Sequence, residues 1–215
     1  MLKLYSYFRS SASYRVRIAL ELKGLPYEYV PVHLVKEGGQ QLKPEYRAIS
    51  ADALVPTLID GDHTLQQSLA IVEYLDEVHP EPKLLPGTAL DRAYVRGLAL
   101  EIACEIHPLN NLRVLKYLKH TVGTPEETKD AWYRHWIELG FGSLQTNLER
   151  GGKAGRFCFG DTPTLADICL VPQVFNAQRF NIDVSRFPVI AKIYEACMEL
   201  PAFQRAQPES QPDAE

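Results

Sequence analysis

Two adjacent hydroxyl side chains, Ser10 and Ser11, stand between two segments of different periodicity. Residues 2–5 alternate as in a short strand, whereas residues 13–23 carry apolar side chains at helical spacing and end at Gly24. The serine hydroxyls and the first free N–H groups of such a helix converge at the positive end of its dipole. A thiolate needs such a site, because a thiol with a pKa of about 8.5 is mostly protonated at pH 7. The alternative interpretation is that the two serines only cap the helix.

A second candidate pair, Gln67 and Ser68, lies where a predicted hairpin meets the next helix. Ser68 as the N-cap, together with the neighbouring N–H groups, can bind a carboxylate. A plain helix cap is the alternative interpretation, and the two roles are compatible. The pair is therefore a candidate binding site for a carboxylate.

The histidines and cysteines show no spacing typical of a metal site or a catalytic dyad. The four cysteines lie far apart without a C-x-x-C pair, and each has apolar neighbours. We therefore expect four buried thiols in a reducing compartment, and no metal. The residues concerned are Cys104, Cys158, Cys169, Cys197, His33, His63, His79, His120 and His135.

The first part of the chain predicts an α/β domain at residues 1–81. A second strand at 27–34 follows the helix, which makes a right-handed parallel β-α-β unit. Residues 55–59 and 63–65 then predict two strands joined by a tight turn, and a helix follows at about 68–79, ended by Pro80.

Beyond a proline-bearing linker the strand signals largely disappear, and we predict a helical domain at residues 88–215. The predicted helices are 91–119 with a break at Pro108, 126–148, 165–177 and 189–200, with a frayed tail after Pro208. Thr164-Leu165-Ala166-Asp167 matches a helix capping box, which we assign to folding.

Composition limits the class of protein. The chain has 215 residues, of which 46% are hydrophobic and 23% charged, with a net charge of −4, as in an ordinary globular protein. Lys and Arg are scattered, so we expect no nucleic-acid partner. No apolar stretch reaches the roughly 18–20 residues of a membrane span, and the first residues lack a signal-peptide pattern, so we expect no membrane partner and a cytoplasmic protein.

Several motifs together resemble the zeta class of the glutathione transferase superfamily, which comprises the maleylacetoacetate isomerases. Residues 5–20, YSYFRSSASYRVRIAL, are similar to its signature S-S-C-[SA]-W-R-V-R-I-A-L. Matches of the same kind occur at residues 38–41, 55–58, 67–71 and 167–174, so the resemblance spans nearly the whole chain. The chain departs from the signature at Ala12, where many members have Cys, and at Tyr14, which replaces Trp.

The resemblance implies a fold and a partner. The first domain is expected to be thioredoxin-like, with a mixed four-stranded sheet and helices, and the second to be an all-α bundle. Glutathione is expected as the cofactor, a cis-configured maleyl diacid as the substrate, and a homodimer as the assembly. If glutathione supplies the nucleophile, the cysteine missing at Ala12 is dispensable.

The resemblance also implies roles for particular residues. Ser10 is expected to donate to the glutathione thiolate, with Ser11 as the close second, since their spacing does not separate them. Glutathione contacts are expected further from Gln41, the backbone of Val55 before a cis Pro56, Gln67, Ser68, His107 and Asn111. His107 stands where the family often has Gln. The substrate carboxylates are expected to meet Arg9, Arg113 and Arg179, because the guanidinium fork holds a carboxylate with two hydrogen bonds. Arg15 and Arg17 are assigned to the surface.

The predicted activity is glutathione-dependent cis–trans isomerisation of a maleyl to a fumaryl group. Maleylacetoacetate is the leading substrate and maleylpyruvate the nearest alternative. A conjugating or dehalogenating transferase that consumes glutathione is a second class, and a non-catalytic binding protein a third. The presence of Ser10, Gln67 and Ser68 argues against the third class.

Overall fold

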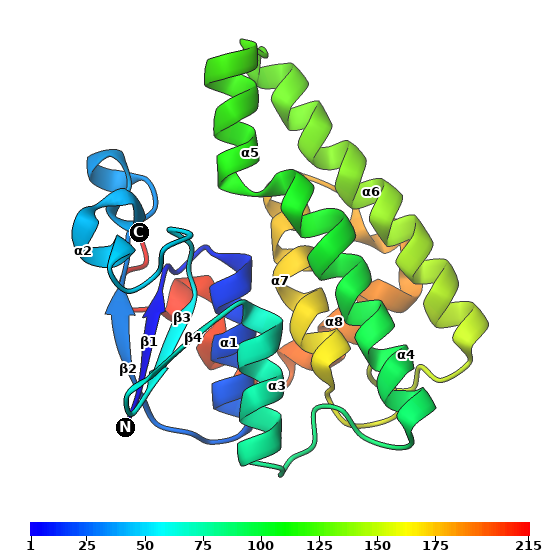
Figure 1. Cartoon of the computed structure of the whole chain (residues 1–215). Coiled ribbons are helices and arrows are strands. Elements are labelled where there is room, and N and C mark those ends of the chain that lie inside the picture. The colour runs from blue at the N-terminus through cyan, green and yellow to red at the C-terminus, as the bar shows by residue number, and fades with distance from the viewer. The chain divides into compact units, whose positions relative to one another are not determined.

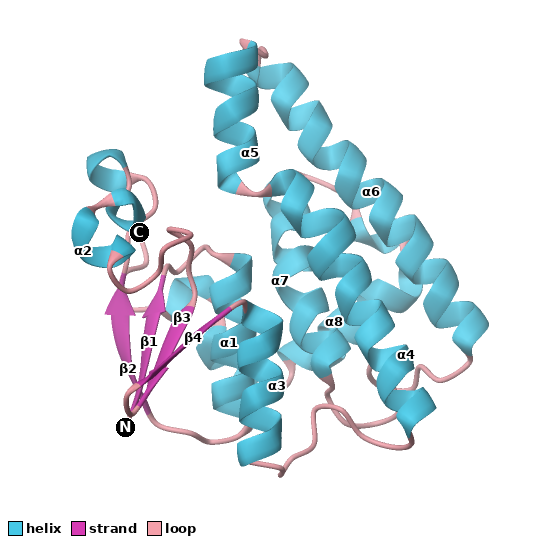
Figure 2. Cartoon of the chain, in the orientation of Figure 1, coloured by secondary structure: helices cyan, strands magenta, loops and turns pink.

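The computed structural model describes residues 1–215 and divides them into two compact units. Unit 1 comprises residues 1–84 together with 198–215, and unit 2 comprises residues 85–197. All strands belong to unit 1, whereas unit 2 is helical (Figures 1 and 2). This is the α/β and all-α organisation that the sequence predicts.

Unit 1 is built on a mixed four-stranded sheet in the order β2-β1-β3-β4. The strands are β1 (Leu2–Ser6), β2 (Tyr27–Pro31), β3 (Thr57–Asp60) and β4 (His63–Gln66). β1 runs parallel to β2, whereas the β1–β3 and β3–β4 pairs are antiparallel. The parallel pair is joined by a helix, and the β3–β4 pair by the predicted tight turn. The predicted mixed sheet is thus confirmed.

Three helices pack beside one another in unit 1: α1 (Ser11–Leu22) contacts both α3 (Ser68–Val78) and α9 (Pro201–Ala206). Figure 1 shows α1 and α3 side by side next to the sheet. A short helix, α2 (Pro44–Arg47), lies in the connection between β2 and β3. The centre of α1 is buried on every side, because α3, α9 and the sheet leave it no exposed face.

Unit 2 consists of α4 (Ala89–Leu100), α5 (Leu112–Tyr117), α6 (Glu126–Gly151), α7 (Leu165–Arg179) and α8 (Pro188–Met198), which ends in unit 1. π-helical and 3-10 turns at 101–110 connect α4 to α5, so the predicted break at Pro108 is confirmed. Helix α7 is buried along most of its length and forms the core of the unit.

The predicted capping box at the start of α7 is present. The carboxylate of Asp167 is fully buried and accepts from the N–H and the hydroxyl of Thr164, both at 2.8 Å, and from the N–H of Cys158 at 2.8 Å. Burial raises the pKa of Asp167, and these hydrogen bonds oppose the rise. The motif orders the loop before α7, which supports its assignment to folding.

The C-terminal segment differs from its prediction in two respects. Residues 198–215 pack on unit 1, although the sequence places them in the helical domain. The tail after Pro208 is not frayed, since Pro208 and Gln211 are buried, and the Gln211 amide donates to the carbonyls of Arg205 and Gln207. The apolar side of α9 drives this packing, because Phe203 and Ala206 are fully buried.

Three of the four cysteines are buried as predicted, but Cys104 is exposed. It lies between Ile102 and Ile106, which take the buried side of the same helical turn and leave Cys104 on the other.

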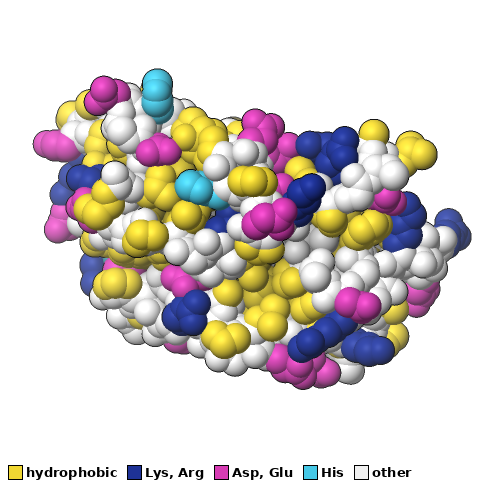
Figure 3. All heavy atoms as spheres, turned by 90° about the horizontal axis from the view of Figure 1, so that it is seen from below, with side chains coloured by type: hydrophobic (Ala, Val, Ile, Leu, Met, Phe, Trp, Pro, Cys, Tyr) yellow, Lys and Arg dark blue, Asp and Glu magenta, His cyan; other side chains and the backbone are white.

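Acidic, basic and apolar side chains are interspersed over the face in Figure 3. None of the helices is long and apolar enough to cross a membrane.

Candidate functional site

The paired serines lie at the N-terminus of α1, as predicted. Ser10 is the N-cap: its hydroxyl oxygen accepts from the N–H of Ser13 at 3.2 Å. Ser11 is the first helical residue and is buried. A hydroxyl that accepts a hydrogen bond can still donate its own hydrogen. Capping therefore leaves Ser10 free to donate to an anion, and the two interpretations of this residue are compatible.

Arg9 precedes the serines in the same loop, and its side chain is exposed. Its guanidinium donates to the hydroxyl of Tyr7 at 3.0 Å and lies 5.0 Å from the ring centre of Phe8. These contacts hold a positive charge beside the N-terminus of α1. The loop thus presents a cation and two hydroxyls.

The carbonyl groups of this loop bind Arg17, which is fully buried. Its guanidinium donates to the carbonyls of Tyr7 at 3.4 Å and Phe8 at 2.9 Å, and its Nε to the carbonyl of Ala206 at 2.9 Å. The surface assignment of Arg17 was therefore wrong. Arg17 joins the serine loop to α9, and burial lowers its pKa.

Arg15 is also buried, with 2% of its surface exposed, so its surface assignment was wrong too. Its Nη1 donates to the hydroxyl oxygen of Ser68 at 3.3 Å, whereas its Nε and Nη2 have no hydrogen-bond partner. A buried guanidinium without a counter-charge is costly, because it has lost its hydration. Arg15 thus brings a buried positive charge next to the Ser68 hydroxyl.

Gln67, the residue before Ser68, has an unusual backbone conformation. Gln67, at the N-cap of α3, has φ 67° and ψ 113°, a conformation that costs a non-glycine residue free energy. Its side chain is exposed, whereas Ser68 is 7% exposed and is the first helical residue. The prediction of Ser68 as the N-cap was therefore wrong: Gln67 holds that position, and no side chain caps the helix. The structure thus places the Ser68 hydroxyl and the start of α3 next to the guanidinium of Arg15.

Val55 and Gln41 lie in two other segments of unit 1. The Val55–Pro56 peptide is cis, and Val55 is buried just before β3. Gln41 is 8% exposed; its Nε2 donates to the carbonyl of Leu34 at 3.4 Å, whereas its Oε1 has no partner. Gln41 is therefore not a solvated loop amide, and its Oε1 can accept from a ligand.

The candidate residues of unit 2 lie in the 3-10 turn at 107–110, at the start of α5 and at the end of α7. His107 is half-buried in a 3-10 turn, and the side-chain oxygen of Asn111 caps α5 by accepting from the N–H of Arg113 at 3.1 Å. The side chain of Arg113 is exposed, as is that of Arg179 at the end of α7. Asn111 thus has a folding role in addition to its predicted one.

Tyr133 on α6 connects the 3-10 turn at 107–110 to Phe180, which follows α7. The sequence analysis did not single out Tyr133. Its carbonyl accepts from the amide of Asn110 at 3.1 Å, and its ring stacks on Phe180 with 3.7 Å between ring centres. Burial raises the pKa of Tyr133 to about 12, and the nearby charge of Arg179 opposes the rise. Tyr133 thus links the turn that carries His107 to Phe180, the residue after Arg179. In the sequence, only the aromatic side chain of Tyr133 could have indicated that it packs between these segments.

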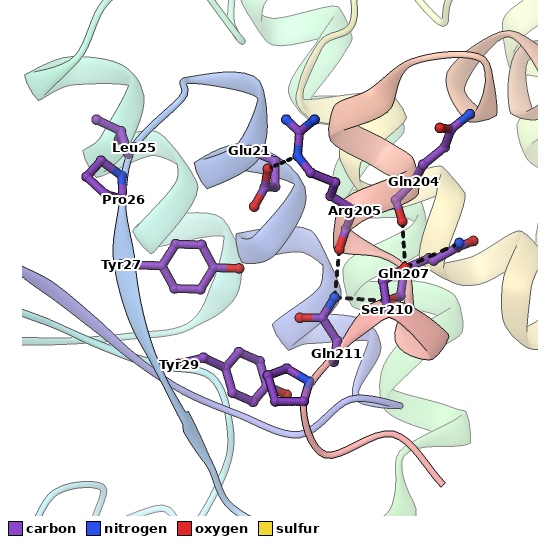
Figure 4. A pocket seen from close by; sticks show the side chains of 11 residues that line it. Glu21, Leu25, Pro26, Tyr27, Tyr29, Gln204, Arg205, Gln207, Ser210 and Gln211 are labelled. Atoms are coloured by element: carbon purple, nitrogen blue, oxygen red, sulfur yellow. Dashed lines mark hydrogen bonds and ion pairs between the residues drawn. The ribbon is translucent and has the colours of Figure 1, made fainter.

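A separate open groove in unit 1, of about 680 Å³, runs between β2 and the C-terminal segment (Figure 4). Tyr27 and Tyr29 line one side, and the ion pair between Glu21 and Arg205, at 2.7 Å, lies at its edge. None of the predicted site residues lines it. The structure also contains no group of three or more His, Cys, Asp or Glu residues placed to hold a metal.

Comparison with known proteins assigns the family. The model of the glutathione S-transferase N-terminal domain matches residues 4–83, and that of the C-terminal domain matches residues 130–196. The chain belongs to the glutathione transferase superfamily, in its zeta class. A probable maleylacetoacetate isomerase of Vibrio cholerae serotype O1 is 52% identical over 98% of this chain and 97% of its own.

Solved structures agree with this assignment. A holo structure of maleyl pyruvate isomerase, described as a bacterial zeta-class glutathione transferase, is 49% identical with a TM-score of 0.96, over 99% of this chain and 100% of its own. A maleylacetoacetate isomerase from Methylobacterium extorquens AM1, with bound malonate and GSH, is 41% identical with a TM-score of 0.95, over 99% of both chains.

Proposed function

We propose that the protein catalyses the glutathione-dependent cis–trans isomerisation of a maleyl diacid to its fumaryl isomer, with maleylacetoacetate as the leading substrate. The observation that carries this proposal is the buried guanidinium of Arg15, which has two unpaired donor atoms beside Ser68. Glutathione carries an anion in its γ-glutamyl carboxylate. The relatives named as isomerases, and the solved structure with bound GSH, support the same cofactor.

The residues present fit glutathione along its length. Gln67, Ser68 and the N–H groups at the start of α3 bind the γ-glutamyl carboxylate, and the buried charge of Arg15 lies next to the Ser68 hydroxyl. The backbone of Val55 pairs with the cysteinyl part as an added strand. Gln41 is assigned to the glycine end, where its unpaired Oε1 can accept only from the glycine amide N–H, because a carboxylate has no hydrogen to donate. Further contacts from unit 2 are assigned to His107 and Asn111.

The chemistry depends on a thiolate. When bound, glutathione supplies a sulfur nucleophile that adds to the maleyl double bond, which becomes single and can rotate before elimination restores it and releases the thiolate. The hydroxyl of Ser10, or that of Ser11, donates to the sulfur and keeps it ionised at neutral pH, aided by the dipole of α1.

Three of the exposed arginines are assigned to hold the diacid. Arg9, Arg113 and Arg179 present guanidinium groups that match carboxylates with two parallel hydrogen bonds. Their positive charge also stabilises the negative charge that develops on the substrate oxygen during addition. The rotation then takes place with both ends of the substrate bound.

Two further assignments concern the cellular compartment and the oligomeric state of the protein. The free thiols, three of them buried, support a reducing compartment, and we assign the protein to the cytoplasm. A homodimer is the assembly assigned from the superfamily. Size-exclusion chromatography with light scattering tests it, and a monomeric mass at assay concentration would contradict it.

The function is tested by parallel assays on maleylacetoacetate and maleylpyruvate, with and without catalytic glutathione, following the fumaryl product. Turnover of either substrate with full recovery of glutathione is expected. Preference for maleylpyruvate would assign the shorter substrate. Stoichiometric loss of glutathione would instead indicate a conjugating or dehalogenating transferase, and binding of glutathione without isomerisation would refute the isomerase.

A further inference from the structure

The end of the chain contacts the loop that carries the paired serines. Asp213 is half-buried in unit 1, and one of its carboxylate oxygens accepts from the N–H of Phe8 at 3.1 Å. Its other oxygen accepts from the hydroxyl of Tyr29 at 2.5 Å. Phe8 lies two residues before Ser10, although 205 positions separate it from Asp213. A residue at the end of the chain thus holds the backbone of the predicted thiolate site.

The C-terminal segment has a defined path to this contact. The amide of Gln211 donates to the carbonyls of Arg205 and Gln207, at 2.8 and 2.9 Å, and folds the segment back on α9 (Figure 4). Beyond Asp213, the carboxylate of Glu215 contacts the ring of His33 at 3.1 Å. The chain is therefore held by hydrogen bonds both before and after Asp213.

The two peptide groups of Phe8 are held by groups of opposite charge. Asp213 accepts from its N–H, and buried Arg17 donates to its carbonyl at 2.9 Å. The next residue is Arg9, and the N–H of Ser10 donates back to the carbonyl of Tyr7 at 2.9 Å. The loop between β1 and α1 is therefore clamped on both sides, by charge-assisted hydrogen bonds that are stronger than neutral ones.

We propose that Asp213 is a positioning residue for the thiolate site, because its bond to the Phe8 N–H fixes the loop that sets the direction of the Ser10 hydroxyl. This inference rests on the proposed function and deepens it. A carboxylate is suited to the task, since its two oxygens bind the loop and the β2 residue Tyr29 at the same time. A loop free to shift by about 1 Å would lose much of the alignment that catalysis requires.

The test compares Asp213→Ala and Asp213→Asn in the full chain, with Glu209→Ala as the matched control. Glu209 is an exposed carboxylate in the same C-terminal segment, so it reports the effect of removing a charge there. For each protein, kcat and KM are measured with maleylacetoacetate and glutathione. The thiolate pKa of bound glutathione is followed by ultraviolet absorbance, and Tm is recorded as the control for folding.

With Asp213→Ala we expect kcat to fall about tenfold per folded molecule, because the serine loop loses its alignment. The thiolate pKa of bound glutathione is expected to rise. Asp213→Asn keeps an oxygen that can accept from the Phe8 N–H, so it is expected to retain more activity, and Glu209→Ala to match the unmodified protein.

Two results would overturn the inference. A lower Tm with unchanged kcat and thiolate pKa would make Asp213 a purely structural residue. A fall in the thiolate pKa would mean that only its negative charge matters, since removing a nearby negative charge favours a thiolate. If the unmodified protein bound glutathione but isomerised neither substrate, the proposed function would fail, and the thiolate pKa of the variants would still decide the role of Asp213.

Discussion

The guanidinium of Arg15 donates to the hydroxyl oxygen of Ser68 at 3.3 Å, across 53 positions of the chain. This bond joins α1 to the start of α3, and it leaves two buried donor atoms of Arg15 unpaired. Charged groups are rarely buried without partners, because their desolvation is not compensated. The protein therefore keeps a buried positive charge next to the Ser68 hydroxyl at the start of α3.

Arg15→Met is expected to weaken glutathione binding about tenfold, because the carboxylate site at Ser68 loses a buried positive charge close by. Without glutathione, the free energy of unfolding should stay the same or rise, since Met fills a similar volume without an unpaired charge. Isothermal titration calorimetry and urea unfolding measure the two quantities. Arg205→Met, which removes an exposed arginine of unit 1, is the control. Unchanged affinity for glutathione would contradict this role of Arg15.

Ser10→Ala is expected to lower kcat roughly tenfold to a hundredfold and to raise the thiolate pKa of bound glutathione, with little change in glutathione affinity. Because Ser10 also caps α1, this variant should lose about 1 kcal/mol of unfolding free energy. Ser10→Thr keeps both a cap and a donor, and separates the two effects. If Ser11→Ala reduces kcat and Ser10→Ala does not, the thiolate donor is Ser11.

Arg179→Met is expected to raise the KM for the diacid about tenfold or more, because the substrate loses a charge-assisted pair. Glutathione affinity should not change. Arg186→Met is a matched control: Arg186 is also exposed in unit 2, and both guanidinium groups lie 5.9 Å from a phenylalanine ring centre. Steady-state kinetics with varied diacid measure the effect. An equal KM in both variants would place the carboxylate site elsewhere.

Asp167→Asn is expected to cost about 2 kcal/mol or more of unfolding free energy, since an amide cannot accept from all three buried donors around it. Thr164→Ala should cost about 1 kcal/mol, the usual effect of losing a helix cap. Urea unfolding measures both variants. Activity per folded molecule should be unchanged; a specific loss of kcat in a fully folded variant would give the box a catalytic role.

The order of the strands and of the longer helices could be predicted from sequence because it depends on local signals, whereas the short helices α2 and α9 were not predicted. Alternation, helical periodicity and the turn at 60–62 act within a few residues of the chain. The cap at Ser10, the box at Thr164 and the break at Pro108 are local for the same reason, since a helix end is defined by its nearest hydrogen bonds. The serine pair of the candidate site belongs to this group.

Whether a charged side chain is buried or exposed was decided only by the tertiary structure. Arginine is usually exposed, and nothing local distinguishes the buried Arg15 and Arg17 from surface arginines. Their burial follows from contacts with Ser68, 53 positions away, and Ala206, 189 positions away. The C-terminal tail is similar: its composition suggests fraying, but its contacts with α9 and Phe8 hold it on unit 1. Local sequence sets the elements, whereas the environment of each side chain depends on which distant elements pack against it.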